Sequence, residues 1–204
     1  MTTGHYIYPM KRKIFREDIL NAGQEIMFDN GYNATGIKEI TDKVNIPKGS
    51  FYNHFENKEA FGLEVLQRYC DNGVRMHKRR LENKELPALE RLEIMYDNII
   101  KNYANNLQFK KGCIMSNFST ELGDTNEKFR AVLDAQFNEI ETIIYNTLKE
   151  AQEDGSLITT LDCKATASFI LNSWHGALVR MKSTANEKPL IDFKELIFNN
   201  VLKN

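Results

Sequence analysis

Prolines, cysteines and net charge are all scarce in this chain of 204 residues, which has four prolines, three cysteines and a formal net charge of -1 at pH 7. Cys70, Cys113 and Cys163 are far apart and match no metal-ligand spacing, and their odd number fits no closed set of disulfides. No apolar run approaches the ~20 residues that a membrane-spanning helix needs. We therefore expect a cytoplasmic protein with reduced thiols, no metal, no other cofactor and no membrane contact.

The scarcity of net charge also limits how the chain can meet nucleic acid. A protein that coats nucleic acid non-specifically needs a large basic surface, which this nearly neutral chain lacks. Any affinity for nucleic acid must therefore come from a local basic or polar patch. The basic cluster Met10–Arg16 is either a solvated helix start or an arm that rests on phosphate. The opening residues, MTTGHYIYPMKRK, place basic side chains after the apolar ones, which is the reverse of a secretory signal peptide.

What is present is a periodic distribution of apolar residues. They make up 42% of the chain and recur at three- and four-residue spacing, which predicts an all-α fold of about nine helices. The expected helices are residues 16–30, 36–44, 47–55, 58–80, 88–107, 113–122, 126–154, 163–183 and 192–202. Polar capping residues, glycines and prolines mark their ends.

The segment Thr35–Lys58 predicts a helix-turn-helix, in which two short helices meet at a tight turn and one is free to enter a DNA major groove. Thr35 is placed to cap the first of these helices, and Pro47 suits the first turn of the second. Phe51 and Phe55, four residues apart, face the core, so polar side chains remain on the outward face.

Residues from about 10 to 75 resemble the TetR family of bacterial transcriptional regulators. The resemblance is carried by Thr35 with Ile40-Thr41, by the run VNIPKGSFY from Val44 to Tyr52, by His54-Phe55 and by Asn57-Lys58-Glu59. This chain has Asn45-Ile46 where several members have alanine or glycine. The resemblance implies an N-terminal three-helix DNA-binding domain at 10–75, with the helix-turn-helix at 36–55, and a helical ligand-binding and dimerisation domain at 76–204.

The resemblance further implies a ligand-responsive, sequence-specific repressor that binds a palindromic double-stranded DNA operator as a homodimer and is released by a small hydrophobic or electrophilic effector. The residues expected at DNA are Thr35, Lys48, Gly49, Ser50, Tyr52, Asn53, His54 and Lys58. Lys48, Ser50 and Asn53 are expected at base edges or adjacent phosphates, and the other side chains at the DNA backbone. Because backbone contacts do not read sequence, the operator itself is not predicted.

Two C-terminal helices, 163–183 and 192–202, resemble the pair through which members of the family dimerise. Small residues allow close approach between helices, and two such pairs would form a four-helix bundle about a two-fold axis. The residues expected at the dimer interface are Ala167, Ser173, Gly176, Ala177, Phe193, Leu196 and Ile197.

The middle helices are expected to enclose a mostly apolar pocket for an unidentified small-molecule effector, with ordinary core packing as the alternative for each residue. The candidates are Tyr96, Ile99, Tyr103, Cys113, Met115, Phe118, Phe137, Trp174 and Leu178. Cys113 also raises the alternative of a thiol sensor for oxidants or electrophiles, because it follows Lys110-Lys111-Gly112 at a helix start, where positive charge favours a thiolate. Against this, cysteine is commonly a small buried hydrophobe.

Two other classes of function stay open. A helical enzyme could use Cys113 with His175, but the sequence identifies no third orienting group, phosphate loop or hydrolase motif, so we expect no enzyme activity. A structural helical dimer with a vestigial DNA-binding motif is the second.

Overall fold

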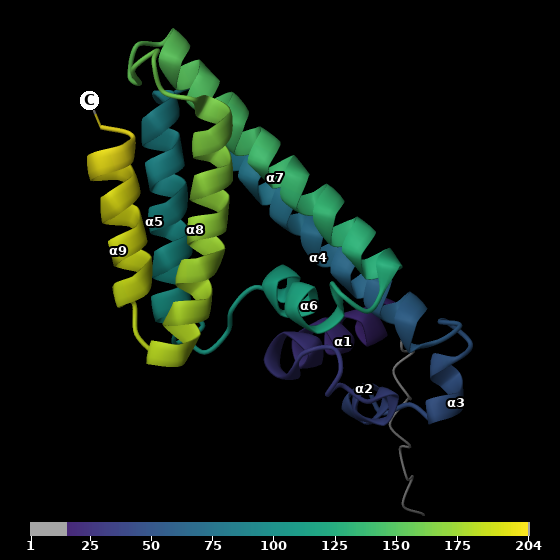
Figure 1. The fold of residues 1–204 in the computed structure, drawn as a ribbon. Helices are drawn as coiled ribbons and strands as arrows, with labels where there is room; N and C mark the ends of the chain where they lie inside the picture. Colours follow the sequence, from purple (N-terminus) through teal and green to yellow (C-terminus); the bar gives the residue numbers. More distant parts are fainter. Residues whose placement is uncertain (1–15, 204) are drawn as a thin grey trace, which may run out of the picture.

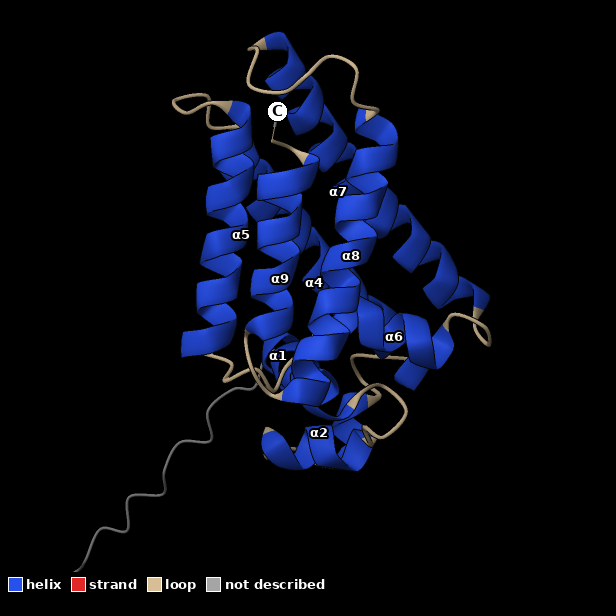
Figure 2. Cartoon of the chain, turned by 60° about the vertical axis from the view of Figure 1, so that its left-hand side comes forward, coloured by secondary structure: helices blue, strands red, loops and turns tan. Residues whose placement is uncertain are grey.

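The computed structural model describes residues 16–203, in which every regular element is helical (Figures 1 and 2). The elements are α1 (Arg16–Asn30), α2 (Ile37–Lys43), α3 (Lys48–Phe51), α4 (Lys58–Leu81), α5 (Ala88–Asn105), α6 (Ile114–Leu122), α7 (Glu127–Glu153), α8 (Cys163–Thr184) and α9 (Lys188–Leu196), which continues as a π-turn (Ile197–Val201). The all-α prediction with about nine helices is confirmed for this part of the chain. Apart from Arg16, the basic cluster Met10–Arg16 lies outside the described residues.

Several helix ends follow directly from the local sequence. The Asn57 side chain accepts a hydrogen bond from the Ala60 N–H at 2.8 Å, and the Asp162 side chain accepts one from the Lys164 N–H at 2.9 Å. Each satisfies a backbone donor that the first helical turn leaves unpaired. Gly31 ends α1 with φ +83, a left-handed conformation that glycine adopts without a steric cost.

Three of the differences from the predicted helix ends concern the DNA-binding segment and the C-terminal helix. Thr35 does not cap α2: Gly36 is the capping residue, and the Thr35 hydroxyl instead donates to the Gly31 carbonyl at 2.6 Å. Helix α3 ends at Phe51, and the chain goes on to Phe55 through tight turns. Helix α9 begins at Lys188 rather than at 192, because Pro189 fits the first helical turn.

The DNA-binding unit, which we define as α1 to α3, packs against the first turns of α4 around a group of aromatic rings. The centroids of Phe51 and Phe61 are 5.1 Å apart, and those of Phe55 and Phe61 are 4.7 Å apart. Gly23 of α1 makes room for the Phe61 ring. The outward face of α3 is therefore fixed by a buried aromatic core directly beneath it.

The body, defined as α4 to α9, is a bundle in which α4 and α7 run side by side and α5, α8 and α9 pack at the end away from α3 (Figure 1). Buried Arg91 of α5 donates to the Leu81 carbonyl at the end of α4 and pairs with Glu150 of α7 at 2.6 Å. Helix α6 lies between the rest of the body and α1 (Figure 1). The end of α4 is thus held by two other helices, while its first turns belong to the DNA-binding unit.

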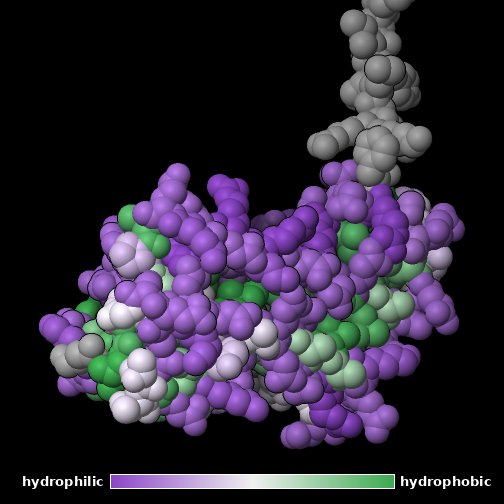
Figure 3. Space-filling model, turned by 90° about the horizontal axis from the view of Figure 1, so that it is seen from above, coloured by the Kyte–Doolittle hydropathy of each residue, from purple (hydrophilic) through white to green (hydrophobic). Residues whose placement is uncertain are grey.

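The face of the molecule shown in Figure 3 is mainly hydrophilic, with groups of hydrophobic residues among the polar ones. Among the helices of residues 16–203, none combines the length and apolar character needed to cross a membrane.

Candidate DNA-binding surface and effector cavity

The outward face of α3 and of the turn after it carries the polar side chains expected at DNA. Lys48, Gly49, Tyr52, Asn53 and His54 are exposed, whereas Phe51 and Phe55 are buried. Ser50 is half-buried. Tyr52 is 49% exposed although its ring lies edge-on to Phe51, so a large aromatic side chain with a free rim stands on this surface. Such a face can donate to phosphate oxygens and reach base edges.

Thr35 and Lys58, which were expected at the DNA backbone, are less accessible than the exposed residues of α3. The Thr35 side chain is only 1% exposed, because its hydroxyl closes the turn after α1, so the expected side-chain contact between Thr35 and DNA is wrong. Lys58 is half-buried, with Nζ 4.4 Å from the centroid of Tyr32 and donating to the Asn33 carbonyl at 3.3 Å. Burial lowers the pKa of Lys58. It connects α4 with the loop between α1 and α2.

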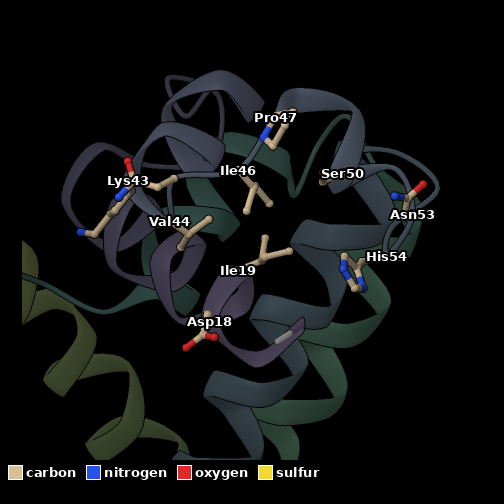
Figure 4. Close-up of a pocket in the computed structure, with 10 residues that line it drawn as sticks. Asp18, Ile19, Lys43, Val44, Ile46, Pro47, Ser50, Asn53 and His54 are labelled. Carbon is tan, nitrogen blue, oxygen red and sulfur yellow. The ribbon is translucent and has the colours of Figure 1, made fainter. Parts of the chain in front are cut away.

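A groove beside the recognition face was not expected from the sequence. Figure 4 shows Ile19 and Ile46 pointing toward each other at its floor, with Ser50, Asn53 and His54 along one side. Lys43 lies on the other side, and its Nζ pairs with Glu25 at 2.8 Å. The groove is bounded by the start of α1, by the turn between α2 and α3, and by α3 with the turn after it.

A second hollow, a cavity of about 330 Å³, lies among the helices of the body beside α1. Seven of the nine expected effector residues line it: Tyr96, Ile99, Tyr103, Cys113, Met115, Trp174 and Leu178. Phe118 does not, because it is fully buried against Tyr32 and Phe129, at centroid distances of 5.6 and 5.7 Å. Phe137 does not either, since it packs edge-on against His175 at 5.0 Å. The prediction that these two phenylalanines line the pocket is therefore corrected.

Helix α4 supplies a wall of the cavity that the sequence reasoning missed. Tyr69, Asn72, Gly73, Met76 and His77 line it, as do His175 of α8 and Gln24 of α1. The signal was present: positions 69, 72, 73, 76 and 77 recur at three- and four-residue spacing and so form one helical stripe. The same helix therefore contributes both to the DNA-binding unit, through Lys58, and to the cavity.

Cys113 is buried at the start of α6, and the hydroxyl of Tyr69 donates to its sulfur at 3.7 Å. Lys111, one of the expected cations, pairs instead with Asp29 at 2.7 Å and lies over the Phe28 ring. Lys111 is therefore engaged elsewhere, and the electrostatic argument for a Cys113 thiolate loses one of its two lysines. Burial raises the pKa of the other two thiols, that of Cys70 to about 12.

The expected dimer residues divide into two groups. Ala167, Phe193 and Ile197 are mostly buried within the protomer, and the Phe193 ring packs against Tyr96 and Trp174 at centroid distances of 5.1 and 5.2 Å. Ala167 is fully buried and faces the core. A shallow groove along α8 and α9 is lined by Phe169, Ser173, Ala177, Phe193, Leu196 and Ile197, and Gly176 is exposed nearby.

Within residues 16–203, no group of three or more His, Cys, Asp or Glu side chains is placed to hold a metal ion. An exposed recognition helix above an aromatic core, attached to a helical body with an internal cavity, defines a helix-turn-helix regulator.

Comparison with known proteins agrees with that class over most of the chain. The family described as "Bacterial regulatory proteins, tetR family" matches residues 19–65, and "Tetracyclin repressor-like, C-terminal domain" matches residues 88–197. The HTH-type transcriptional repressor DhaR of Mycobacterium sp. (strain GP1) is 34% identical over 193 residues, 95% of each chain. The transcriptional regulator AcuR of Cereibacter sphaeroides is 30% identical, covering 87% of this chain and 80% of AcuR.

Among solved structures, regulatory protein TetR from Rhodobacter sphaeroides superposes with a TM-score of 0.84 at 29% identity, over 90% of this chain and 96% of that one. The reduced form of NemR from Escherichia coli superposes with a TM-score of 0.82 over 90% and 95% of the two chains, at 24% identity, and so shows the shared fold. The chain belongs to the TetR family of bacterial regulatory proteins and is a DNA-binding transcriptional regulator.

Proposed function

We propose that the chain is a repressor that binds a palindromic operator as a homodimer and leaves it when a small hydrophobic molecule enters the cavity of the body. One observation carries the proposal: α6 has its first turn at the cavity and its last turn bonded to the DNA-binding unit. Met115 lines the cavity, and the carboxylate of Glu121 accepts hydrogen bonds from the backbone N–H groups of Tyr32 and Asn33.

The output surface in this proposal is the exposed face of α3. Lys48, Ser50 and Asn53 contact base edges or neighbouring phosphates, while Tyr52 and His54 contact the DNA backbone. Lys58, which lies over the Tyr32 ring, also contacts the DNA backbone. The chain has almost no net charge, so two copies of this surface are needed to reach a useful affinity. The DNA-binding domain spans residues 10–75 and the regulatory domain 76–204, with the boundary inside α4.

The two copies pair through α8 and α9. Leu196 is 52% exposed and Phe169 is 48% exposed along the groove between these helices, which is unusual for large apolar side chains unless a partner covers them. Ser173, Gly176 and Ala177 allow a second copy to approach closely. Repression is supported by two relatives, DhaR and NemR, which are both transcriptional repressors.

Release follows from differential binding. A molecule that fits the cavity better in one arrangement of α4 and α6 favours that arrangement by the difference in its binding free energy. Because α6 is bonded to the loop after α1, and α4 carries Lys58, the favoured arrangement changes the distance between the two recognition helices of the dimer. The operator then loses one of its two half-site contacts.

The test is fluorescence anisotropy with the DNA upstream of the protein's own gene, at moderate salt. Wild type is expected to bind this DNA specifically, and Tyr52→Ala is expected to weaken binding about tenfold while leaving thermal unfolding unchanged, since Tyr52 is exposed. The proposal is contradicted if wild type does not bind this DNA specifically, or if Tyr52→Ala binds it with the same affinity as wild type.

A thiol-sensing function is the second candidate, and the contact of Cys113 with the cavity favours it. In this function the thiolate displaces iodide from a probe such as iodoacetamide and forms a thioether, which fills the cavity. Iodoacetamide is expected to release wild type from DNA but not Cys113→Ser, whereas Cys70→Ser should respond as wild type does. Equal release of Cys113→Ser removes this candidate.

A further inference from the structure

The wall of the cavity carries no formal charge. None of the described residues that line it is Lys, Arg, Asp or Glu. Its two histidines are held neutral by burial, which lowers the pKa of His77 and brings that of His175 to about 4. An ionised ligand would lose its hydration here without gaining a charged partner, which is costly. The occupant of this cavity is therefore uncharged.

The tautomer of His77 is fixed by its own helix. His77 Nδ1 lies 2.8 Å from the Gly73 carbonyl oxygen, and a carbonyl can only accept, so Nδ1 carries the hydrogen. The other nitrogen, Nε2, is then a bare acceptor. It has no hydrogen-bond partner among the described residues, although His77 is one of the cavity-lining side chains. At this position the cavity thus offers an acceptor that a donor on its occupant can satisfy.

Two hydrogen-bond donors on the opposite helices are also unused. Tyr96 is 2% exposed and Trp174 is 8% exposed, yet neither the Tyr96 hydroxyl nor the Trp174 indole N–H has a hydrogen-bond partner in the described part of the chain. Neither polar atom is fully buried, so both remain accessible to a ligand although their residues are buried overall. By contrast, the neighbouring hydroxyls of Tyr69 and Tyr103 donate to Cys113 Sγ and to the Gly112 carbonyl.

The rest of the wall suits a ring. The Tyr96 and Trp174 rings meet edge-on at a centroid distance of 5.1 Å, and Met76 and Met115 add polarisable, adaptable surface. A volume of about 330 Å³ is at the small end of ligand pockets and accommodates one or two rings.

From this arrangement we propose that the effector is an uncharged phenol, whose hydroxyl donates to His77 Nε2 and whose oxygen accepts from the unpaired donors of Tyr96 and Trp174. This proposal rests on the proposed function, since it names the ligand class of the cavity through which the regulator is released. The phenol hydroxyl satisfies both kinds of unpaired group with one atom, which neither a hydrocarbon nor an ether does.

The experiment is isothermal titration calorimetry on the full chain without DNA, using thymol, thymol methyl ether and isopropylbenzoate. These probes share an isopropyl-substituted ring and differ as donor, acceptor-only and anionic ligands. Wild type is expected to bind thymol at least tenfold more tightly than its methyl ether, and to bind the benzoate most weakly. His77→Phe is expected to bring the ratio between thymol and its ether close to one, because the ring remains and the acceptor is lost.

The ratio is measured within one variant, so a general loss of folding cancels from it. Arg79→Ala, an exposed position two residues further along α4, is the matched control and keeps the wild-type ratio. A wild-type ratio near one, tightest binding of the benzoate, no binding of thymol, or an unchanged ratio in His77→Phe overturns the phenol assignment. None of these outcomes involves DNA, so operator binding measured separately still decides the proposed function.

Discussion

Glu121 of α6 accepts a hydrogen bond from the backbone N–H of Asn33 at 2.7 Å, and its second carboxylate oxygen accepts from the neighbouring Tyr32 N–H at 3.1 Å. One side chain of the body thereby holds the loop between α1 and α2 of the DNA-binding unit. Hydrogen bonds to an ionised carboxylate are stronger than neutral ones. The two hydrogen bonds join α6, whose first turn lines the cavity, to the loop that leads into α2.

Replacing this carboxylate should loosen that connection. Glu121→Ala is expected to lower the free energy of unfolding by about 1 to 2 kcal/mol, because two backbone donors lose their acceptor. It is also expected to reduce the effector-induced loss of operator affinity, since movement of α6 no longer pulls on the loop. Urea unfolding and anisotropy with and without effector measure the two effects.

The control for Glu121 is Glu127→Ala, which removes an exposed glutamate from the start of α7. This variant should change the free energy of unfolding by less than about 0.5 kcal/mol and should respond to the effector as wild type does. A Glu121→Ala protein that responds to effector as wild type does would show that the coupling runs through α4 alone.

Lys48 provides a test of the recognition face through the salt dependence of binding. Lys48→Ala is expected to reduce the slope of log affinity against log salt by about one for each protomer, because one phosphate contact and its released counterion are lost. Lys101→Ala, an exposed lysine of α5, should keep the wild-type slope. Anisotropy titrations at several salt concentrations give both slopes, and equal slopes for the two variants exclude Lys48 from the contact surface.

Leu196 tests the pairing of two copies. Leu196→Glu places a charge in the apolar groove of α8 and α9, so the dimer is expected to dissociate and operator affinity to fall at least tenfold, with helix content retained. Sedimentation velocity and circular dichroism measure these. Ile158→Glu, at an exposed apolar residue after α7 and outside that groove, is the matched control. If Leu196→Glu remains dimeric, the interface between the two copies lies on another surface.

His175 predicts how stability depends on pH. Burial lowers its pKa in the folded protein from 6.5 to about 4, so the unfolded chain takes up the proton first. Stability is therefore present above about pH 6.5 and is lost as the pH falls toward 4, by up to about 3 kcal/mol. His77 changes in the same direction.

The measurement is the urea midpoint between pH 7 and pH 4. His175→Gln should flatten this dependence, while Asn172→Ala, an exposed change on the same helix, should not. The same acid dependence in His175→Gln and wild type would assign the loss of stability to other groups.

Two glycines should respond to alanine with opposite sign. A Cβ at Gly23 would lie 2.2 Å from Phe61 Cζ, and that ring is fully buried among Phe51 and Phe55, so Gly23→Ala should destabilise the protein by about 1 to 3 kcal/mol. A Cβ at Gly73 meets no heavy atom within 4 Å, so Gly73→Ala should stabilise α4 by up to about 1 kcal/mol. Thermal unfolding of both variants decides, and destabilisation of equal size would contradict the packing argument.

The sequence by itself determined the features that depend on near neighbours in the chain. Asn57 and Asp162 cap their helices, and Gly31 ends α1, because each acts on backbone groups within a few residues. Phe51 faces inward and Tyr52 outward because helical spacing fixes which residues share a face. The exposed recognition face could therefore be predicted nearly complete, and the same spacing gave most of the cavity residues on α5, α6 and α8.

Only the tertiary structure decided which of several local options each side chain takes. Thr35 suits a helix cap by its chemistry, but the loop after α1 buries it. Phe118 and Met115 share one short helix, yet the packing of Tyr32 and Phe129 directs Phe118 away from the cavity. His77 joined the cavity because α4 lies beside helices far from it in the chain. Such contacts depend on how distant helices pack, and the spacing of residues within one helix does not contain that information.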